Sequence, residues 1–312
     1  MTDSGQRLLL LDTASLYFRA FFGVPDSMRA PDGTPVNAVR GLMDFISRLV
    51  GEYDPTHLAC CWDDDWRPQW RVDLIPSYKA HRVVRAIPGP RPDVEEVPDP
   101  LETQIPIIQS VLAAYGIPVV GHAEMEADDV IGTLATGAGM PVDIVTGDRD
   151  LFQLVDDDAA VRVLYVARGV SKHERVDNAW VRTKYGVDAK QYADLATLRG
   201  DASDGLPGVA GVGDKTAATL LNRFGTVGAI VEAALDPDSD MGPGPRGKIK
   251  AAEDYLAVAP QVVAVRRDLD LGSPDLTRPR TPVDHAAVVA LDEQWDLGSS
   301  AVRLVEALSG SD

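Results

Sequence analysis

The stretch GDASDGLPGVAGVGDKTA, residues 200–217, joins two features with opposite electrostatic preferences. It begins with two carboxylates, Asp201 and Asp204, and continues as a glycine-rich loop that leads into a predicted helix start near Lys215. Glycine-rich loops at helix starts often bind phosphate, because their backbone amides and the helix dipole favour anions. Carboxylates repel phosphate, so the two acids of this stretch need a separate explanation.

The bulk composition limits the class of protein. The chain has 312 residues, of which 45% are hydrophobic and 25% charged, and a formal net charge of −18. Such a length suits one large or two medium domains. Taken alone, the negative charge argues against a sequence-blind nucleic-acid binder, although local patches and bound cations set the field that a ligand meets.

Adjacent Cys60 and Cys61 in an apolar run predict core residues and a reducing compartment. The N-terminus lacks the features of a signal peptide and no apolar run approaches membrane-spanning length, so we expect a cytoplasmic protein.

The order of apolar and amphipathic segments predicts two domains and a final helix. Residues 1–184 read as an α/β domain with a mainly parallel sheet, residues 185–290 as an all-helical module, and residues 291–312 as a helix that packs back. The proline-broken stretch 83–100 is unlikely to be regular throughout, and 236–247 and 273–283 read as loops. The expected strands are 7–12, 56–63, 117–121, 142–148 and 161–166, and the expected helices of the first domain include 37–51, 101–115 and 126–137.

Acidic residues follow the predicted strands and begin the predicted helix at 126. In open α/β sheets the carboxyl ends of the strands form one crevice, so these acids are expected to converge. Each acid alone is more often a turn or cap residue than a ligand, and their joint placement reverses that preference. A cluster of this kind needs divalent cations, and hard ions such as Mg²⁺ and Mn²⁺ prefer oxygen ligands. The nine candidates are Asp12, Asp63, Glu126, Asp128, Asp129, Asp148, Asp150, Asp201 and Asp204.

Six motifs in order, LLLLD…YFR, WD, YKAHR, EADDV, TGDRD and GDASDGLPGVAGVGDKTA, give the chain a resemblance to the structure-specific 5′ nucleases. These include flap endonucleases and the 5′-nuclease domain of bacterial DNA polymerase I. The resemblance implies a PIN-like domain with two or more Mg²⁺ or Mn²⁺ ions. Its first metal site would involve Asp12, Asp63, Glu126, Asp128 and Asp129. The remaining acids, Asp148, Asp150, Asp201 and Asp204, would include those of the second site.

The same resemblance assigns the glycine-rich loop to a helix–three-turn–helix module. In relatives this module grips the phosphates of duplex DNA, often with a bound monovalent cation such as K⁺. The cations would therefore reconcile the acids with phosphate, and the loop would hold the duplex at a fixed distance from the metal site. The residues implied in this contact are Gly208, Gly211, Gly213, Lys215 and Thr216.

The stretch YKAHR lies in a locally basic region of this acidic chain. Residues 66–91 carry six basic side chains (Arg67, Arg71, Lys79, Arg82, Arg85 and Arg91) against the single acid Asp73. Such a patch is expected where a nucleic-acid strand passes, although an ordinary solvated surface is the alternative. By resemblance, Lys79 would stabilise charge on the scissile phosphate, Arg82 would steer the 5′ strand, and about 78–103 would form an arch.

Several assignments stay open at the level of sequence. Arg19 is expected to contact phosphate or form a structural salt bridge, and Tyr78 to stack on a base or pack in the protein. The acidic part of the arch, 93–102, could be a plain surface loop. Thr13 stands where relatives usually have glycine, and Gly205 replaces a commoner asparagine that could have braced its loop.

The interpretation is a free-standing, monomeric, nucleoid-associated enzyme that hydrolyses DNA at 5′ ends, nicks and 5′ flaps in replication and repair, with an RNA 5′ segment in a hybrid as a further substrate. Two other classes compete with it: a junction-binding protein without catalysis, and a PIN-type ribonuclease. The intact acids argue against the first, and the duplex-gripping motif argues against the second.

Overall fold

A computed structural model describes residues 5–85 and 93–310, and its centre is a six-stranded sheet. The strand order is β5 (Val119–Val120), β2 (His57–Cys61), β1 (Leu8–Asp12), β6 (Val142–Thr146), β7 (Val161–Tyr165) and β8 (Glu174–Val176). All pairings are parallel except that of β7 with β8, which is antiparallel. Both β1 and β6 are buried throughout, as expected of a parallel sheet covered on both faces, and β1 is apolar up to its final residue, Asp12.

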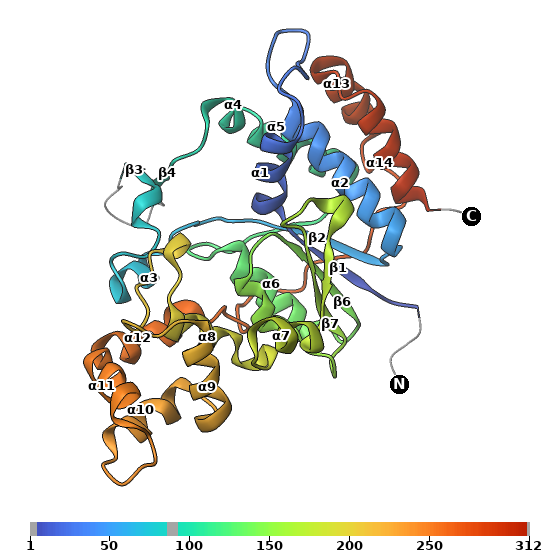
Figure 1. Cartoon of the computed structure of the whole chain (residues 1–312). Coiled ribbons are helices and arrows are strands. Elements are labelled where there is room, and N and C mark those ends of the chain that lie inside the picture. Colours follow the sequence, from blue (N-terminus) through green and yellow to red (C-terminus); the bar gives the residue numbers. More distant parts are fainter. Residues whose placement is uncertain (1–4, 86–92, 311–312) are drawn as a thin grey trace.

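Helices cover both faces of the sheet (Figure 1). One core lies between the sheet and α1 (Thr13–Gly23), α2 (Asn37–Tyr53) and α5 (Ile105–Tyr115). The C-terminal helices α13 (His285–Trp295) and α14 (Ser299–Ser309) pack against α5 and α2 and extend this core. The other core lies between the sheet and α6 (Ala127–Gly137), and it continues without a break into the helical module.

The second module is entirely helical. It comprises α7 (Asn178–Tyr185), α8 (Tyr192–Arg199), α9 (Asp214–Phe224), α10 (Val227–Leu235), α11 (Pro243–Ala251) and α12 (Glu253–Val263). In Figure 1, α8 to α12 form a compact group to one side of the sheet. The parallel sheet and the helical second module predicted from the sequence are confirmed.

The basic stretch forms a small subdomain next to the carboxyl ends of the strands. It contains α3 (Gln69–Leu74), the 3₁₀ turn η1 (Ala80–Arg82) and an antiparallel pair of β3 (Val83–Arg85) with β4 (Val94–Glu95), followed by α4 (Asp99–Glu102). The expectation that 83–100 is not regular throughout agrees with these short elements. Residues 86–92 of the expected arch, including Arg91, lie outside the described residues.

The structure corrects three expectations about local elements. The strand expected at 117–121 has only two residues, the helix expected at 101–115 is divided between α4 and α5, and α11 begins inside the expected loop 236–247. Helix α1 and the antiparallel strand β8 were not predicted. These errors concern short elements whose residues gain their partners from distant parts of the chain. None of the described helices is long and apolar enough to cross a membrane.

Candidate active site

Asp12 lies where β1 passes directly into α1. Its Oδ1 accepts a hydrogen bond from the Ser15 amide at 3.1 Å, so the side chain caps α1, and its Oδ2 accepts one from the Thr146 hydroxyl at 2.6 Å. The residue is buried, and burial raises the pKa of its carboxyl to about 7. The carboxylates of Asp63 and Asp148 raise it further. Asp12 therefore caps α1 and also lies close to the carboxylates of Asp63 and Asp148.

Four other acids face the same hollow. Asp63 follows β2 and accepts the Ala127 amide at 2.7 Å, which ties it to the start of α6. Asp128 is in the first turn of α6, and Asp148 follows β6. Burial raises the pKa of Asp128 well above its ordinary value, and Asp148 and Asp12 add to that shift. Together with Asp12 and Glu126, these side chains line a pocket of about 250 Å³, which we call the carboxylate pocket.

A second group of acids adjoins Asp148. Asp150 begins the 3₁₀ turn η2 (Asp150–Leu154), while Asp201 and Asp204 bracket the turn η5 (Ala202–Asp204). Burial raises the pKa of Asp150 well above its ordinary value, with further contributions from Asp148, Asp204 and Asp201. Burial also raises the pKa of Asp204 to about 6. The two groups therefore influence each other through Asp148.

These carboxylates fit divalent cations chemically. Buried like charges destabilise one another, and the buried Oδ1 of Asp150 has no hydrogen-bond partner. Among the residues that the structure describes, no three acidic, His or Cys side chains are close enough together to hold an ion in this conformation. The donors are instead spaced around a pocket, which suits a hard ion that keeps part of its water shell, as Mg²⁺ does.

Glu126 differs from its neighbours because two cations neutralise it. Its carboxylate lies 2.5 Å from the Lys79 ammonium and 3.0 Å from the Arg71 guanidinium, and it accepts the Tyr78 hydroxyl at 2.7 Å. Burial alone would raise the pKa of Glu126, but Lys79 and Arg71 lower it below its ordinary value. Glu126 is consequently ionised, and it holds the Lys79 ammonium at the wall of the pocket.

The structure corrects the assignment of Tyr78 to DNA. Its ring is 3% exposed and packs in a core cluster with Ile75 and Leu206. A side chain in that position has no free face on which a base could stack. Of the two alternatives left open by the sequence, packing is the observed one.

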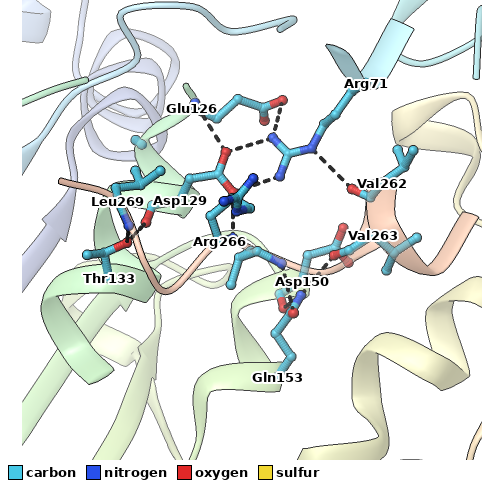
Figure 2. Close-up of polar contacts among 12 residues, drawn as sticks. Arg71, Glu126, Asp129, Thr133, Asp150, Gln153, Val262, Val263, Arg266 and Leu269 are labelled. Carbon is cyan, nitrogen blue, oxygen red and sulfur yellow. Dashed lines mark hydrogen bonds and ion pairs between the residues drawn. The ribbon is translucent and has the colours of Figure 1, made fainter. Parts of the chain in front are cut away.

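Asp129 also departs from its predicted role as a metal ligand. It is fully buried, and Arg71 binds both of its oxygens, at 2.9 and 2.7 Å (Figure 2). The backbone amide of Arg266 donates to the same carboxylate at 2.8 Å. Since every direction of approach is already used by protein donors, we remove Asp129 from the ligand set.

Two predicted phosphate contacts lie at the border of the carboxylate pocket. Arg82 lines it, donates to the Ser203 carbonyl at 2.9 Å and lies 3.4 Å from Asp204. Arg19 lies in an adjoining, larger pocket between α1, α2 and α14, where it donates to the Ala167 carbonyl. In this structure the Arg19 guanidinium contacts the backbone, and its contact with phosphate stays a prediction.

The glycine-rich loop packs against the end of α8. A Cβ atom on Gly208 would lie 2.5 Å from the Arg199 carbonyl carbon, so this glycine is required for close backbone packing. Gly211 and Gly213 are exposed, and Gly213 precedes α9 without a side-chain cap on the first amides. Helix α9 starts at Asp214, one residue before the predicted start, and Lys215 and Thr216 are in its first turn.

Two departures from the usual pattern have structural reasons. Thr13 is buried at the start of α1, and its hydroxyl donates to the Leu11 carbonyl. Gly205 has a φ of +69°, and a Cβ there would lie 2.1 Å from the Ser77 carbonyl oxygen. The Ser77 hydroxyl donates to the Gly205 carbonyl at 2.7 Å, so direct backbone contact replaces the bracing that a side-chain amide would provide.

Of the residues that line the carboxylate pocket but were not singled out from the sequence, three have large side chains. They are Phe18, Trp66 and Glu95. Phe18 falls within the motif YFR and also lines the adjoining larger pocket. Glu95 belongs to the acidic end of the arch, where a plain surface loop was the alternative, and burial raises its pKa. The arch brings Glu95 to this site, whereas Trp66 precedes the arch and lies three residues after Asp63.

Comparison with known proteins agrees with this arrangement. The family profile described as "5′-3′ exonuclease, N-terminal resolvase-like domain" matches residues 7–186, and "5′-3′ exonuclease, C-terminal SAM fold" matches 187–284. A 5′-3′ exonuclease of Streptomyces coelicolor is 59% identical over 301 residues, covering 96% of this chain and 100% of the relative. A 5′-3′ exonuclease of Mycobacterium tuberculosis is 50% identical over 309 residues, covering 96% and 97%.

A solved structure shows the same fold. The D15 flap endonuclease of bacteriophage T5, in a complex with DNA and metal ions, superimposes with a TM-score of 0.63 at 18% identity, covering 97% of this chain and 99% of that one. The sheet with its carboxylate pocket, the helical module and the extent of these matches lead to one conclusion. The chain belongs to the 5′-3′ exonuclease family of structure-specific 5′ nucleases.

Proposed function

We propose that this protein hydrolyses DNA phosphodiesters next to 5′ ends, nicks and 5′ flap junctions with two or more bound Mg²⁺ or Mn²⁺ ions. The observation that carries the proposal is the set of buried, mutually repelling carboxylates at the carboxyl ends of the strands. Their raised pKa values are the signature of a site whose charge is completed by a bound cation. The T5 enzyme that shares the fold was crystallised with DNA and metal ions.

The acids divide into two ligand groups. Asp12, Asp63, Asp128 and Asp148 would hold one ion, with the ionised Glu126 beside them, and Asp150, Asp201 and Asp204 would hold or orient a second. Bound divalent cations supply positive charge that activates water and offsets the charge of the phosphate oxygens. These eight residues are the ligands and near neighbours that we expect to matter.

Lys79 and Arg82 supply fixed positive charge from the protein itself. Burial would lower the pKa of Lys79, but Glu126 raises it well above its ordinary value, so the ammonium is charged at the pocket wall. It can stabilise a phosphate placed there without losing its proton. The Arg82 side chain is 35% exposed and already oriented by Ser203, so its remaining donors can guide a 5′ strand.

The start of α9 is the proposed contact with duplex DNA. Uncapped amides in the first turn, the exposed Gly211 and Gly213, and Lys215 together suit a phosphate. A K⁺ ion in this loop belongs to the same proposal. It would compete with Lys248, whose ammonium donates to the Gly211 carbonyl at 2.7 Å.

The biological setting follows from the substrate. We expect a monomer that acts on nucleoid DNA in the cytoplasm during replication and repair, and that accepts an RNA 5′ segment in a hybrid. The partition between exonuclease and flap endonuclease activity is left to the experiment.

The deciding experiment uses a 5′-flap duplex carrying either a 5′ label or an internal label, with Mg²⁺, Mn²⁺ or EDTA. We expect cleavage near the junction in either metal and none in EDTA, and product lengths report endonuclease or exonuclease action. Asp148→Asn should abolish cleavage while keeping duplex affinity. Asp254→Asn, at an exposed acid on α12, is the matched control and should cleave normally.

Each rival class predicts a different result. Tight junction binding without cleavage in every metal would identify a non-catalytic junction protein. Cleavage of single-stranded RNA in preference to the flap duplex would identify a PIN-type ribonuclease. Equal loss of cleavage in Asp254→Asn and Asp148→Asn would contradict the assignment of the pocket.

A further inference from the structure

The chain leaves the helical module through a segment that contacts both helices bearing candidate ligands. Residues 262–269 run from the end of α12 across α6 and η2, and we call them the clasp segment (Figure 2). Helix α6 carries Asp128, and η2 begins with Asp150. The clasp segment therefore lies between the module that we expect to grip the duplex and the acids that we expect to hold the ions.

Contacts on the α6 side run along the helix. Arg71 donates to the Val262 carbonyl at 3.1 Å while it binds Asp129 with its other nitrogens. Asp129 accepts the Arg266 amide at 2.8 Å. One turn later, the Thr133 hydroxyl accepts the Leu269 amide at 3.3 Å (Figure 2). The first two turns of α6 are thus attached to both ends of the clasp segment.

Contacts on the η2 side converge on Gln153. Its amide nitrogen donates to the Val263 carbonyl at 3.1 Å and to the Asp150 carbonyl at 2.9 Å, and its amide oxygen accepts the Val265 amide at 3.0 Å. Arg267 returns a bond of 2.8 Å to the Gln153 carbonyl. Gln153 is 5% exposed, and its bonds to Val263 and Val265 are shielded from water.

Gly132 allows this close approach. It lies in the middle of α6, and a Cβ atom there would be 2.4 Å from the Arg266 carbonyl oxygen. Glycine in a helix interior is unfavourable by roughly 1 kcal/mol relative to alanine. Gly137, at the end of the same helix, has no atom within 4 Å of the corresponding position. The need for glycine at position 132 comes from the clasp segment and not from the helix.

We propose that the clasp segment fixes the position of the carboxylate pocket relative to the duplex-binding module, and that Asp129, Gln153 and Gly132 are positioning residues for cleavage. The inference rests on the proposed nuclease function. A cut is made where the held duplex places a phosphodiester against the acids, so a displaced segment changes which bond is cut and how fast. Duplex affinity, which depends on the module's own surface, stays the same.

Two variants alter the clasp segment from opposite sides without changing any proposed ligand. Gly132→Ala inserts a methyl group against Arg266, and Gln153→Met removes the three side-chain hydrogen bonds of Gln153 at nearly constant volume. Their controls are Gly137→Ala on the same helix and Gln109→Met at an exposed site on α5. Far-ultraviolet circular dichroism and urea unfolding first establish that each variant folds.

The kinetic test separates rate, affinity and cut position on the flap duplex. We expect kcat to fall by about 10²-fold in both clasp variants, because misplacement of a reacting group by about 1 Å has that effect. Products should spread over neighbouring phosphodiesters, while KM and the Kd measured in EDTA stay within about 2-fold of wild type, a change below about 0.4 kcal/mol. Unchanged kcat and unchanged product lengths in folded Gly132→Ala and Gln153→Met would overturn the proposal.

A distance measurement tests the same idea without catalysis. Spin labels at Glu232→Cys on α10 and Ser110→Cys on α5 report the separation of the two modules, since native Cys60 and Cys61 are buried. We expect one narrow distance distribution in the parent and in Gly137→Ala, and a broadened or shifted one in Gly132→Ala. An identical distribution in both glycine variants would refute the clasp. Absence of cleavage by a wild-type protein with a narrow distribution would instead refute only the proposed function.

Discussion

The first turn of α6 carries two adjacent aspartates, and they lie in opposite electrostatic environments. Asp128 faces the carboxylate pocket among like charges, and its pKa is raised well above its ordinary value by burial and by Asp148. Asp129, the next residue, is fully buried and paired with Arg71 through both oxygens. What neutralises a buried charge therefore decides its role. The Asp128 carboxylate can bind a cation, whereas the Asp129 carboxylate already forms an ion pair with Arg71 that stabilises the structure.

The largest expected effect is on catalysis at Asp128. Asp128→Asn should reduce flap cleavage by about 10²–10³-fold, the range seen when one group that stabilises the transition state electrostatically is lost. In the absence of metal, the same change should raise the urea midpoint of unfolding, because it removes a destabilising buried acid. A stability loss with normal cleavage would reverse the two roles drawn above.

The next effect is on stability at the other face. Arg71→Met leaves Asp129 and Glu126 buried without their shared partner, which should lower the free energy of unfolding by about 3–5 kcal/mol. Urea denaturation measures this loss. The control is Arg303→Met, which breaks a bidentate pair with Asp44 that is about half exposed and should change stability by at most about 1 kcal/mol. Comparable losses of unfolding free energy in both variants would show that the buried pair of Arg71 and Asp129 stabilises the protein no more than an exposed pair.

The pocket should also make stability depend on pH. Asp12 has a pKa of about 7 in the folded protein against 3.8 when unperturbed, so the folded state binds more protons between these values. Stability in EDTA should therefore fall as pH rises from 4 to 7, with Asp12 contributing at most about 1.4 kcal/mol per pH unit. Thermal unfolding across this range tests the slope. It should become shallower in Asp12→Asn and in saturating Mg²⁺, and a slope unaffected by either would contradict the prediction.

The smallest effect concerns the contact between Ser77, just before the arch, and Gly205, which follows the turn that bears Asp204. Gly205→Ala combines a left-handed φ of +69° with a collision against the Ser77 carbonyl. Gly139→Ala has a similar φ of +63° but open space, so it isolates the backbone term of about 1 kcal/mol. Gly205→Ala should be the more destabilising by about 1–2 kcal/mol. Equal losses in chemical denaturation would mean that Ser77 moves aside freely.

Much of the fold could be predicted from the sequence. A continuous apolar run such as β1 shows its burial directly, and carboxylates at the ends of predicted strands point to one crevice. Helix α1 was missed although its buried positions follow helical spacing: Thr13, Leu16, Tyr17 and Ala20. The short strand β8 was missed because few of its residues carry a periodic signal. The division of 99–115 into α4 and α5 was missed for the same reason.

The site was less completely predictable. The acids themselves could be identified by residue type and spacing, and the requirement for Gly205 was visible only as a departure from the usual pattern. Phe18 lines the pocket and belongs to the motif YFR, whereas nothing in the local sequence of Trp66 or Glu95 distinguishes them from ordinary surface or core residues. The sequence left open whether Tyr78 stacks on a base or packs in the protein, and its hydroxyl donates to Glu126, 48 residues away.

By itself, the sequence determined the parallel sheet, the helical second module and the clustering of acids, because hydrophobic periodicity and strand-end placement are local properties. Only the tertiary structure decided which acids are available to bind a cation. Arg71 reaches Asp129 across 58 residues, and the Arg266 amide reaches it across 137, and no local pattern specifies such contacts. Whether a carboxylate is a ligand or a support depends on which cation lies within a few ångströms of it, and long-range folding alone fixes that distance.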